Sequence, residues 1–275
     1  MSFGTLCKNL FSGSTGFATA EIYINAAEET FANALSSVAM EYPNVSFGSY
    51  PERNRYYIAR ITIESDSMEA TEHAKQKLCA LIPANILVNH DREPEVDCVE
   101  KYQKFLEGTE CRGIYERSVD TLIKYYQSPK AVLIHIDGSI ESVVVIHLVR
   151  IASEKVCPKS KLHAICFEAD ILRPGMKEFL DSIVKRYDVE LVTLPRQSDL
   201  QQTIKDSDLF STGIRLLIGK RFVRHRDGTS HSNFVSSGSS DYLETHYPLT
   251  EWTYSDIEKM AIALSLPYIT SQEDR

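Results

Sequence analysis

The sequence has no long hydrophobic run, no excess of positive charge and no closely spaced pair of cysteines. Apolar runs such as 131–136 and 143–146 are much shorter than the roughly 20 residues of a membrane-spanning helix, so we expect no membrane segment. The chain has 38 acidic and 30 basic residues and a formal net charge of −8. Nucleic-acid binding is therefore not expected, because phosphate neutralisation needs clustered Lys and Arg.

The cysteines also argue against a metal site. None of them forms a Cys-x-x-Cys pair, and no histidine lies at a zinc-ligand spacing, so we expect reduced, partly buried thiols. Residues 1–17 are interrupted by Ser, Gly and Thr before any sustained apolar core, which disfavours a secretory signal. These features favour a cytoplasmic protein with 1–17 as a leader.

With 275 residues and 43% hydrophobic content the chain can bury two modest cores. Residues 18–91 predict a small α+β domain, because period-two and helical patterns alternate there. The expected elements are strands at 20–25, 46–50, 55–65 and 85–90, a helix at 26–42, and a second helix capped by Asp66 with Glu69 that runs to about Leu81.

Residues 92–128 are polar but periodic, and Gly108 and Gly113 divide them into two expected helices. An isolated amphipathic helix has little stability of its own, so these helices are expected to act as an adaptor that packs against the second domain. Tyr125 and Tyr126 could serve that packing or face another subunit.

Residues 129–275 alternate strands and helices, which predicts a Rossmann-like parallel sheet covered by helices. The expected strands are 131–136, 162–167, 189–194 and 214–219, with helices up to Glu154, after Pro174, after Leu194 and after Thr253. Ligands of such sheets bind beyond the carboxyl ends of the strands. We therefore expect 137–142, 168–170 and 219–221 to converge, and 228–241 to be a mobile loop.

The loop after the first of these strands is Asp137-Gly138-Ser139-Ile140-Glu141-Ser142. A phosphate cradle would stand here, yet the loop carries two carboxylates and no cation. It could be an ordinary turn with Ser139 as the helix cap, or Asp137 and Glu141 could hold magnesium as hard oxygen ligands.

Histidines and aromatic residues have simpler interpretations. We expect His135 and His147 to pack or hydrogen bond inside the fold, and His231 and His246 to be polar surface residues. The basic run 220–226 is interpreted as a solvated loop. Trp252 is expected to anchor the core.

The phrase Pro-Leu-Thr-Glu-Trp-Thr-Tyr-Ser-Asp-Ile at 248–257 resembles a signature of eukaryotic FAD synthases, in the phosphoadenylyl-sulfate reductase-like, adenosine nucleotide α-hydrolase group. The resemblance implies that Trp252, Thr253 and Asp256 mark the fold. Residues 21–24, 48–51 and 56–57 resemble the small domain that ends the molybdopterin-binding-like half of these proteins. The larger core of that half is expected to be missing.

The resemblance implies transfer of AMP from ATP to FMN, which gives FAD and pyrophosphate with magnesium. It implies that the nucleotide is bound by Asp137, Gly138, Ser139, Glu141, Ser142, Gly219, Lys220 and Arg221. The family's Asn-Gly-Gly-Lys-Asp-Cys/Ser motif loses its lysine here to Ile140. The family's Gly-x-Arg-Arg-Thr-Asp-Pro loses its aspartate to Arg224, and the Arg-Gly-Tyr-Thr-Ser segment expected after Tyr268 is missing.

These departures weaken the expected nucleotide site. Two like charges about 4 Å apart repel by roughly 4 kcal/mol at an effective dielectric of 20, which corresponds to about a thousandfold in affinity. The leading hypothesis is a catalytically degraded FAD synthase-like pseudoenzyme that binds a protein partner, a second copy of itself or a remnant ligand. The alternative is an active FMN adenylyltransferase with Asp137 and Glu141 on magnesium and Arg221 on phosphate. A third hypothesis is a flavin or adenosine-nucleotide binder without chemistry.

Overall fold

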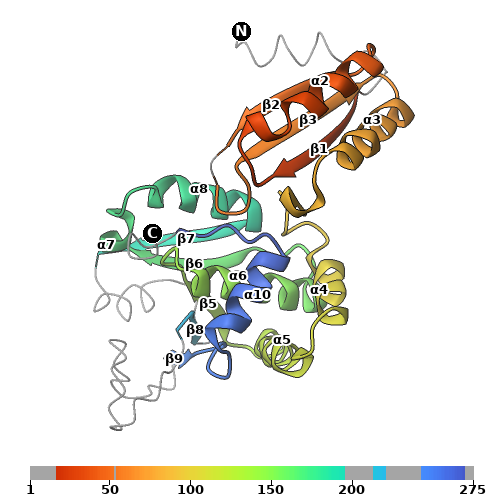
Figure 1. The fold of residues 1–275 in the computed structure, drawn as a ribbon. Helices are drawn as coiled ribbons and strands as arrows, with labels where there is room; N and C mark the ends of the chain where they lie inside the picture. Colours follow the sequence, from red (N-terminus) through yellow and green to blue (C-terminus); the bar gives the residue numbers. More distant parts are fainter. Residues whose placement is uncertain (1–16, 53, 196–212, 221–242, 270–275) are drawn as a thin grey trace. The chain divides into compact units, whose positions relative to one another are not determined.

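The computed structural model describes residues 17–52, 54–195, 213–220 and 243–269 (Figure 1). Four expected segments lie outside these residues: positions 1–16 of the leader, the helix after Leu194, the run 221–226 with Arg221 and Arg224, and the loop 228–241 with His231. The chain forms two compact units. The first ends at His90, and the second begins at Asp91. No helix among the described residues is long and apolar enough to cross a membrane.

The first unit is a four-stranded antiparallel sheet with the order β2-β3-β1-β4. Alternate residues of β1 and β3, such as Ile22, Ile24, Ile61 and Ile63, form its core with residues of α2 and α3. This is the small α+β domain that the sequence predicts. Its elements are β1 (Ala18–Ile24), a 3-10 turn (Glu28–Thr30), α2 (Ala32–Glu41), β2 (Ser46–Pro51), β3 (Ala59–Ser65), α3 (Met68–Leu81), a 3-10 turn (Ala84–Ile86) and β4 (Leu87–Val88).

Three local expectations for this unit are wrong. Ser67 caps α3 by accepting a hydrogen bond from the backbone nitrogen of Ala70 at 3.2 Å, so Asp66 is not the cap. The last strand shrinks to β4 because a 3-10 turn follows Pro83. Strand β3 begins only at Ala59, because the Asn54 side chain accepts hydrogen bonds from the nitrogens of the two tyrosines that follow and folds that segment into a turn.

The second unit contains a five-stranded parallel sheet with the order β7-β6-β5-β8-β9. The predicted Rossmann-like α/β fold and the two adaptor helices are confirmed, while the short edge strand β9 was not predicted. The elements are α4 (Cys98–Glu107), α5 (Arg112–Tyr126), β5 (Ala131–His135), α6 (Ile140–Val156), β6 (Leu162–Phe167), α7 (Glu168–Ile171), α8 (Met176–Tyr187), β7 (Val189–Leu194), β8 (Ile214–Ile218), β9 (Leu243–His246) and α10 (Tyr254–Ala263).

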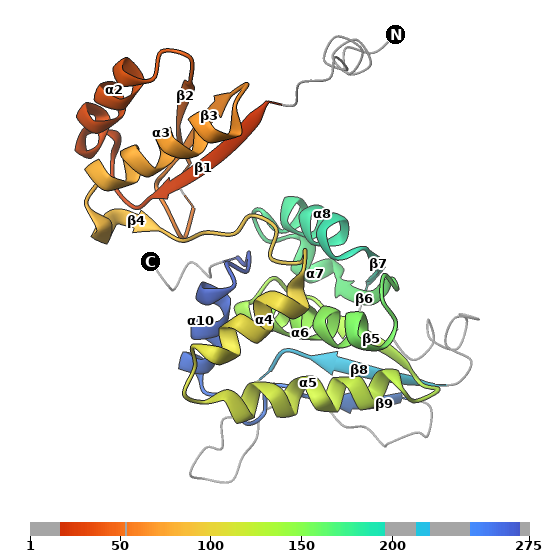
Figure 2. The same ribbon diagram turned by 90° about the vertical axis from the view of Figure 1, so that its right-hand side faces the viewer.

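Helix α6 is the centre of this unit. Its residues from Val143 to Ile146 are all fully buried, so this turn is apolar around its whole circumference. Helices α4, α5 and α10 pack against it, together with strands β5 and β8 (Figure 1). Figure 2 shows α5 lying alongside β8 and β9.

The signature around Trp252 has a structural explanation. Thr253 and Asp256 form a capping box at the start of α10, in which the Thr253 hydroxyl accepts from the Asp256 nitrogen and the carboxylate accepts from the Thr253 nitrogen. The buried Trp252 ring meets Tyr115 edge-on at 4.7 Å, and its indole nitrogen donates to Ser118 Oγ at 2.9 Å. Trp252 is thus the predicted core anchor, and it joins α10 to α5.

His147 makes the fold sensitive to acid. Burial lowers the pKa of His147 from 6.5 to about 3; Nδ1 shares a hydrogen bond with the Tyr187 hydroxyl at 3.0 Å, and Nε2 has no hydrogen-bond partner among the described residues. Between pH 6.5 and 3 the unfolded chain binds a proton that the folded chain excludes. Above pH 6.5 His147 is neutral in both states and the free energy of unfolding has its full value. As the pH falls from 6.5 to 3, the free energy of unfolding decreases by roughly 5 kcal/mol in total.

We expect the His147→Gln variant to lose this dependence, because glutamine can still bond Tyr187 but does not titrate. Below pH 6.5 the free energy of unfolding, measured with urea, should fall with pH less steeply than in the wild type, by up to about 1.4 kcal/mol per pH unit. Parallel slopes for His147→Gln and the wild type would contradict the assignment.

Candidate functional site

The candidate site lies at the carboxyl ends of β5 and β8, where the strand order reverses. Sheets of this type bind ligands at such a point. The chain leaves β5 at His135 and enters α6 at Ile140, and the turn between them places Gly138 at a φ of 77°. This left-handed conformation favours glycine, so the turn depends on that residue.

The polar groups of this loop are bonded to one another. Asp137 Oδ1 accepts hydrogen bonds from the Ser139 nitrogen at 3.0 Å and from the Ser139 hydroxyl at 2.5 Å. Ser139 Oγ in turn accepts from the Ser142 nitrogen at 3.2 Å, which confirms Ser139 as the helix cap. Burial acts to raise the pKa of the Asp137 carboxyl, but hydrogen bonds from Ser139 and Ser142 and the nearby His135 together lower it.

The loop itself carries no cation, but a guanidinium from another segment contacts its backbone. The guanidinium of Arg173, between α7 and α8, donates a hydrogen bond to the Asp137 carbonyl oxygen and lies 3.5 Å from Asp170 Oδ1. Asp170 Oδ2 is also 3.6 Å from His135 Nε2. Arg173 was not predicted, because it lies 36 positions away and is brought to the loop by the parallel pairing of β5 with β6.

Gly219 approaches the loop from the end of β8. A β-carbon on it would lie 2.6 Å from the carbonyl carbon of Glu141 and 2.6 Å from the nitrogen of Ser142, so only glycine fits there. The predicted convergence of the three loops is thus observed for Asp137, Asp170 and Gly219. Lys220 follows directly, with its nitrogen bonded to the Ile218 carbonyl at 2.9 Å.

Two apolar side chains lie against the turn. A β-carbon built on Gly138 would lie 2.9 Å from Met176 Sδ and 3.3 Å from Ile269 Cδ1. The backbone nitrogen of Ile269 donates to the Gly138 carbonyl oxygen at 3.0 Å. The segment after α10 therefore covers this part of the loop.

The remaining loop residues divide between core and surface. Ile140, which replaces the lysine of the resembled motif, is only 5% exposed and packs in the main core. Glu141 is partly buried in the first turn of α6. Among the described residues, no group of three or more His, Cys, Asp or Glu side chains is arranged to hold a metal ion.

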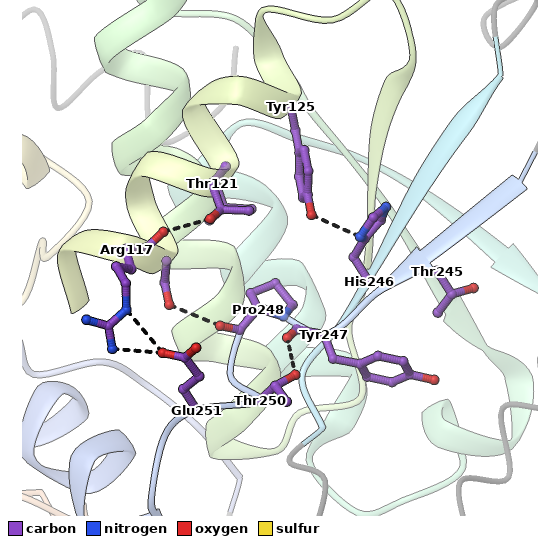
Figure 3. A pocket seen from close by; sticks show the side chains of 11 residues that line it. Arg117, Thr121, Tyr125, Thr245, His246, Tyr247, Pro248, Thr250 and Glu251 are labelled. Atoms are coloured by element: carbon purple, nitrogen blue, oxygen red, sulfur yellow. Dashed lines mark hydrogen bonds and ion pairs between the residues drawn. The ribbon is translucent and has the colours of Figure 1, made fainter. Parts of the chain in front are cut away.

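A separate pocket of about 420 Å³ opens between α5 and the segment that follows β9 (Figure 3). His246 lines it: its Nδ1 lies 2.9 Å from the Tyr125 hydroxyl, and its Nε2 lies 3.5 Å from Glu244 Oε2. Sequence reasoning missed this pocket, because its two walls are more than 100 positions apart in the chain.

These features define an α/β protein with a Rossmann-like parallel sheet and a small α+β domain. Residues 16–91 match the family model of the FAD synthase middle domain. The probable FAD synthase of Caenorhabditis elegans is 25% identical over 264 residues, which cover 90% of this chain and 50% of the relative. The probable FAD synthase of Caenorhabditis briggsae is 26% identical over 263 residues, with the same coverage.

The chain is therefore FAD synthase-like, as its motifs predicted, and it spans about half the length of the curated relatives it matches. Among solved structures it matches the Candida glabrata FMN adenylyltransferase in complex with FAD and pyrophosphate. That match has a TM-score of 0.45 at 16% identity and covers 60% of this chain and 63% of that one. Yeast FAD synthetase in complex with FAD matches with a TM-score of 0.42 at 14% identity, over 60% and 65% of the two chains.

Removal of the Ser139 hydroxyl should loosen the loop. In Ser139→Ala the Ser142 nitrogen loses its cap and Asp137 loses a donor, so we expect the free energy of unfolding to fall by about 1 to 2 kcal/mol. Ser139→Thr keeps the hydroxyl and should retain most of the stability. Urea unfolding of the two variants measures the difference, and equal stabilities would show that the hydroxyl does not cap α6.

Proposed function

We propose that this chain is a FAD synthase-like protein that does not transfer AMP to FMN and that acts by binding a protein partner, a second copy of itself or a remnant ligand. One observation carries the proposal: the loop where a nucleotide's phosphates would bind is bonded and covered by the protein's own groups. A cytoplasmic location is part of the same proposal.

The backbone groups of the loop support it. A phosphate cradle works when N–H groups at a helix start face the anion at close range. Here the Ser139 nitrogen donates to Asp137 and the Ser142 nitrogen donates to Ser139 Oγ, so two donors of the first turn are already used. Ile269 and Met176 lie against Gly138 and prevent close approach from their side.

The charges support it as well. Ile140 puts a buried apolar side chain where the resembled motif has lysine. The Asp137 carboxylate is directed back to Ser139 rather than outward. Both hydrogen bonds of the turn fall on Oδ1 of Asp137, so the turn already uses one of the oxygens with which Asp137 and Glu141 would hold a magnesium ion.

One observation favours the alternative, an active FMN adenylyltransferase. Arg173 brings a guanidinium to the loop, and its side chain is 46% exposed, so it could also contact an anion. An active enzyme of this kind would need Glu141 for the metal, and Glu141→Ala would abolish its turnover.

A direct assay separates the two. Purified protein incubated with FMN and MgATP should form no FAD above a blank without protein, as measured by chromatography. The Candida glabrata FMN adenylyltransferase serves as the positive control for the reagents. FAD formation that Glu141→Ala removes would establish the enzyme and reject our proposal.

The closed loop makes a further prediction about ligands. MgATP, FMN and FAD should not raise the melting temperature of the wild-type protein, since a ligand stabilises only a folded state that binds it. Ile269→Gly uncovers Gly138 and should create a rise with MgATP. If wild type already responds to MgATP as strongly as Ile269→Gly, closure by Ile269 does not exclude the nucleotide.

The proposed protein partner has a candidate contact beside the loop. Leu172 precedes Arg173, is 86% exposed and places an apolar side chain at the edge of the site. We expect Leu172→Asp to weaken a stoichiometric complex or a dimer, as measured by light scattering of the purified species. Met68→Asp, a change at a residue 69% exposed in the first unit, is the matched control. Equal complex formation by both variants would show that Leu172 is not in the interface.

A further inference from the structure

The pocket between α5 and the segment after β9 is independent of the loop at Gly138. Helix α5 contributes Arg117, Thr121 and Tyr125, which lie one above the other at spacings of four residues. His246, Pro248 and Glu251 form the opposite wall. Its volume of about 420 Å³ lies in the range of small-molecule sites.

The mouth of the pocket carries a guanidinium that a ligand can reach. Arg117 Nε and Nη2 both donate to Glu251 Oε2, at 3.1 and 2.8 Å (Figure 3). The two side chains are 61% and 65% exposed, and an ion pair so exposed contributes little. A carboxylate or phosphate group on a ligand can therefore take the place of Glu251 at small cost, because a guanidinium binds such groups with two parallel hydrogen bonds.

The charges behind the pocket also favour an anion. Lys130 Nζ and Arg215 Nε lie 2.6 and 3.0 Å from the two oxygens of one carboxylate, Glu244. Hydrogen bonding to Lys130, to His246 and to Arg215 lowers the pKa of Glu244 to about 2 despite the opposing effect of burial. Two cations share one carboxylate in this cluster, so Lys130, Arg215 and Glu244 together carry one positive charge within a chain of net charge −8.

The interior of the pocket fits a ring with a hydrogen-bond donor. The hydroxyls of Thr121 and Thr250 donate to backbone carbonyls, at 2.8 and 2.7 Å, so their protons are used and their lone pairs can accept. The Tyr125 and His246 rings, with centroids 4.7 Å apart, add flat surfaces near Pro248. A planar ring with a hydroxyl group can satisfy these walls.

We propose that this pocket binds a small aromatic anion, a ring that carries one carboxylate or phosphate group for Arg117 and a donor for the threonine hydroxyls. Tyr125 and His246 form the wall that the ring contacts. The proposal goes beyond the proposed function and does not rest on it, since its residues are separate from those of the loop.

Trp252 provides the measurement. It is the only tryptophan of the chain, and its indole nitrogen donates to Ser118, which lines the pocket. The indole ¹⁵N–¹H resonance should shift when 4-hydroxybenzoate is titrated into the full chain at millimolar concentration. We expect 4-hydroxybenzamide, the neutral analogue, to bind about tenfold more weakly, and the cation tyramine more weakly still. Phenyl phosphate shows whether phosphate replaces carboxylate.

Two variants and one control test the role of Arg117. Arg117→Gln should weaken 4-hydroxybenzoate about tenfold, while Glu251→Gln should tighten it several-fold because it leaves the guanidinium unpaired. Arg112→Gln is the matched control, since Arg112 lies on the same helix and pairs with Glu116 at 2.7 Å outside the pocket. A melting curve for each variant confirms that it is folded.

The proposal is overturned by any of three results. The first is no shift of the Trp252 resonance with either anion. The second is equal affinity for the benzoate, the benzamide and tyramine. The third is the same affinity in Arg117→Gln and Arg112→Gln.

Discussion

The burial of α6 is the constraint on which the rest of the second unit depends. A helix turn that is apolar on all sides must be surrounded, and α4, α5, α10 and the sheet provide that cover. Because protein interiors are packed as densely as organic crystals, such a helix has one position along its axis. Its first turn is thereby held at the ends of β5 and β8. Helix α5, packed on it, is held beside β9, where the pocket forms.

The same helix start explains why the loop is closed. Backbone donors at a helix terminus must find partners, whether in a ligand or in the chain itself. Here Asp137 and Ser139 supply those partners, and Arg173 and Ile269 bond the two carbonyls of the turn. The loop thereby satisfies part of its own hydrogen-bonding capacity, and fewer of its groups are left for a ligand.

The pocket beside α5 shows the opposite arrangement. Its threonine hydroxyls donate their protons to the backbone, and its ion pair between Arg117 and Glu251 is exposed to solvent. The threonine oxygens and the Arg117 guanidinium are therefore accessible to a ligand in this pocket. Loop and pocket lie on one unit and are built from different residues, so a change in one does not remove the binding groups of the other.

Much of the fold was predictable because it follows from local patterns. Alternation from β5 to β8 specified a parallel sheet, and the capping residues Ser139 and Thr253 were read correctly because a cap and its partner lie within three positions. The FAD synthase-like character was readable from the Trp252 phrase. Strand β9 was missed because it has only four residues, two of which are Glu244 and His246, and so short a segment shows no clear alternation of apolar and polar residues. Its strand conformation depends on its pairing with β8.

The sequence by itself determined the fold class, the helix start at Ser139, the anchor Trp252 and the loss of lysine at Ile140, because each depends on neighbouring residues or on a residue's own chemistry. Only the tertiary structure decided that Arg173 supplies a cation, that Ile269 covers Gly138 and that His246 meets Tyr125. These contacts join segments from 36 to 131 positions apart. The packing of the sheet on α6 determines which distant segments meet, and local sequence patterns do not predict that packing.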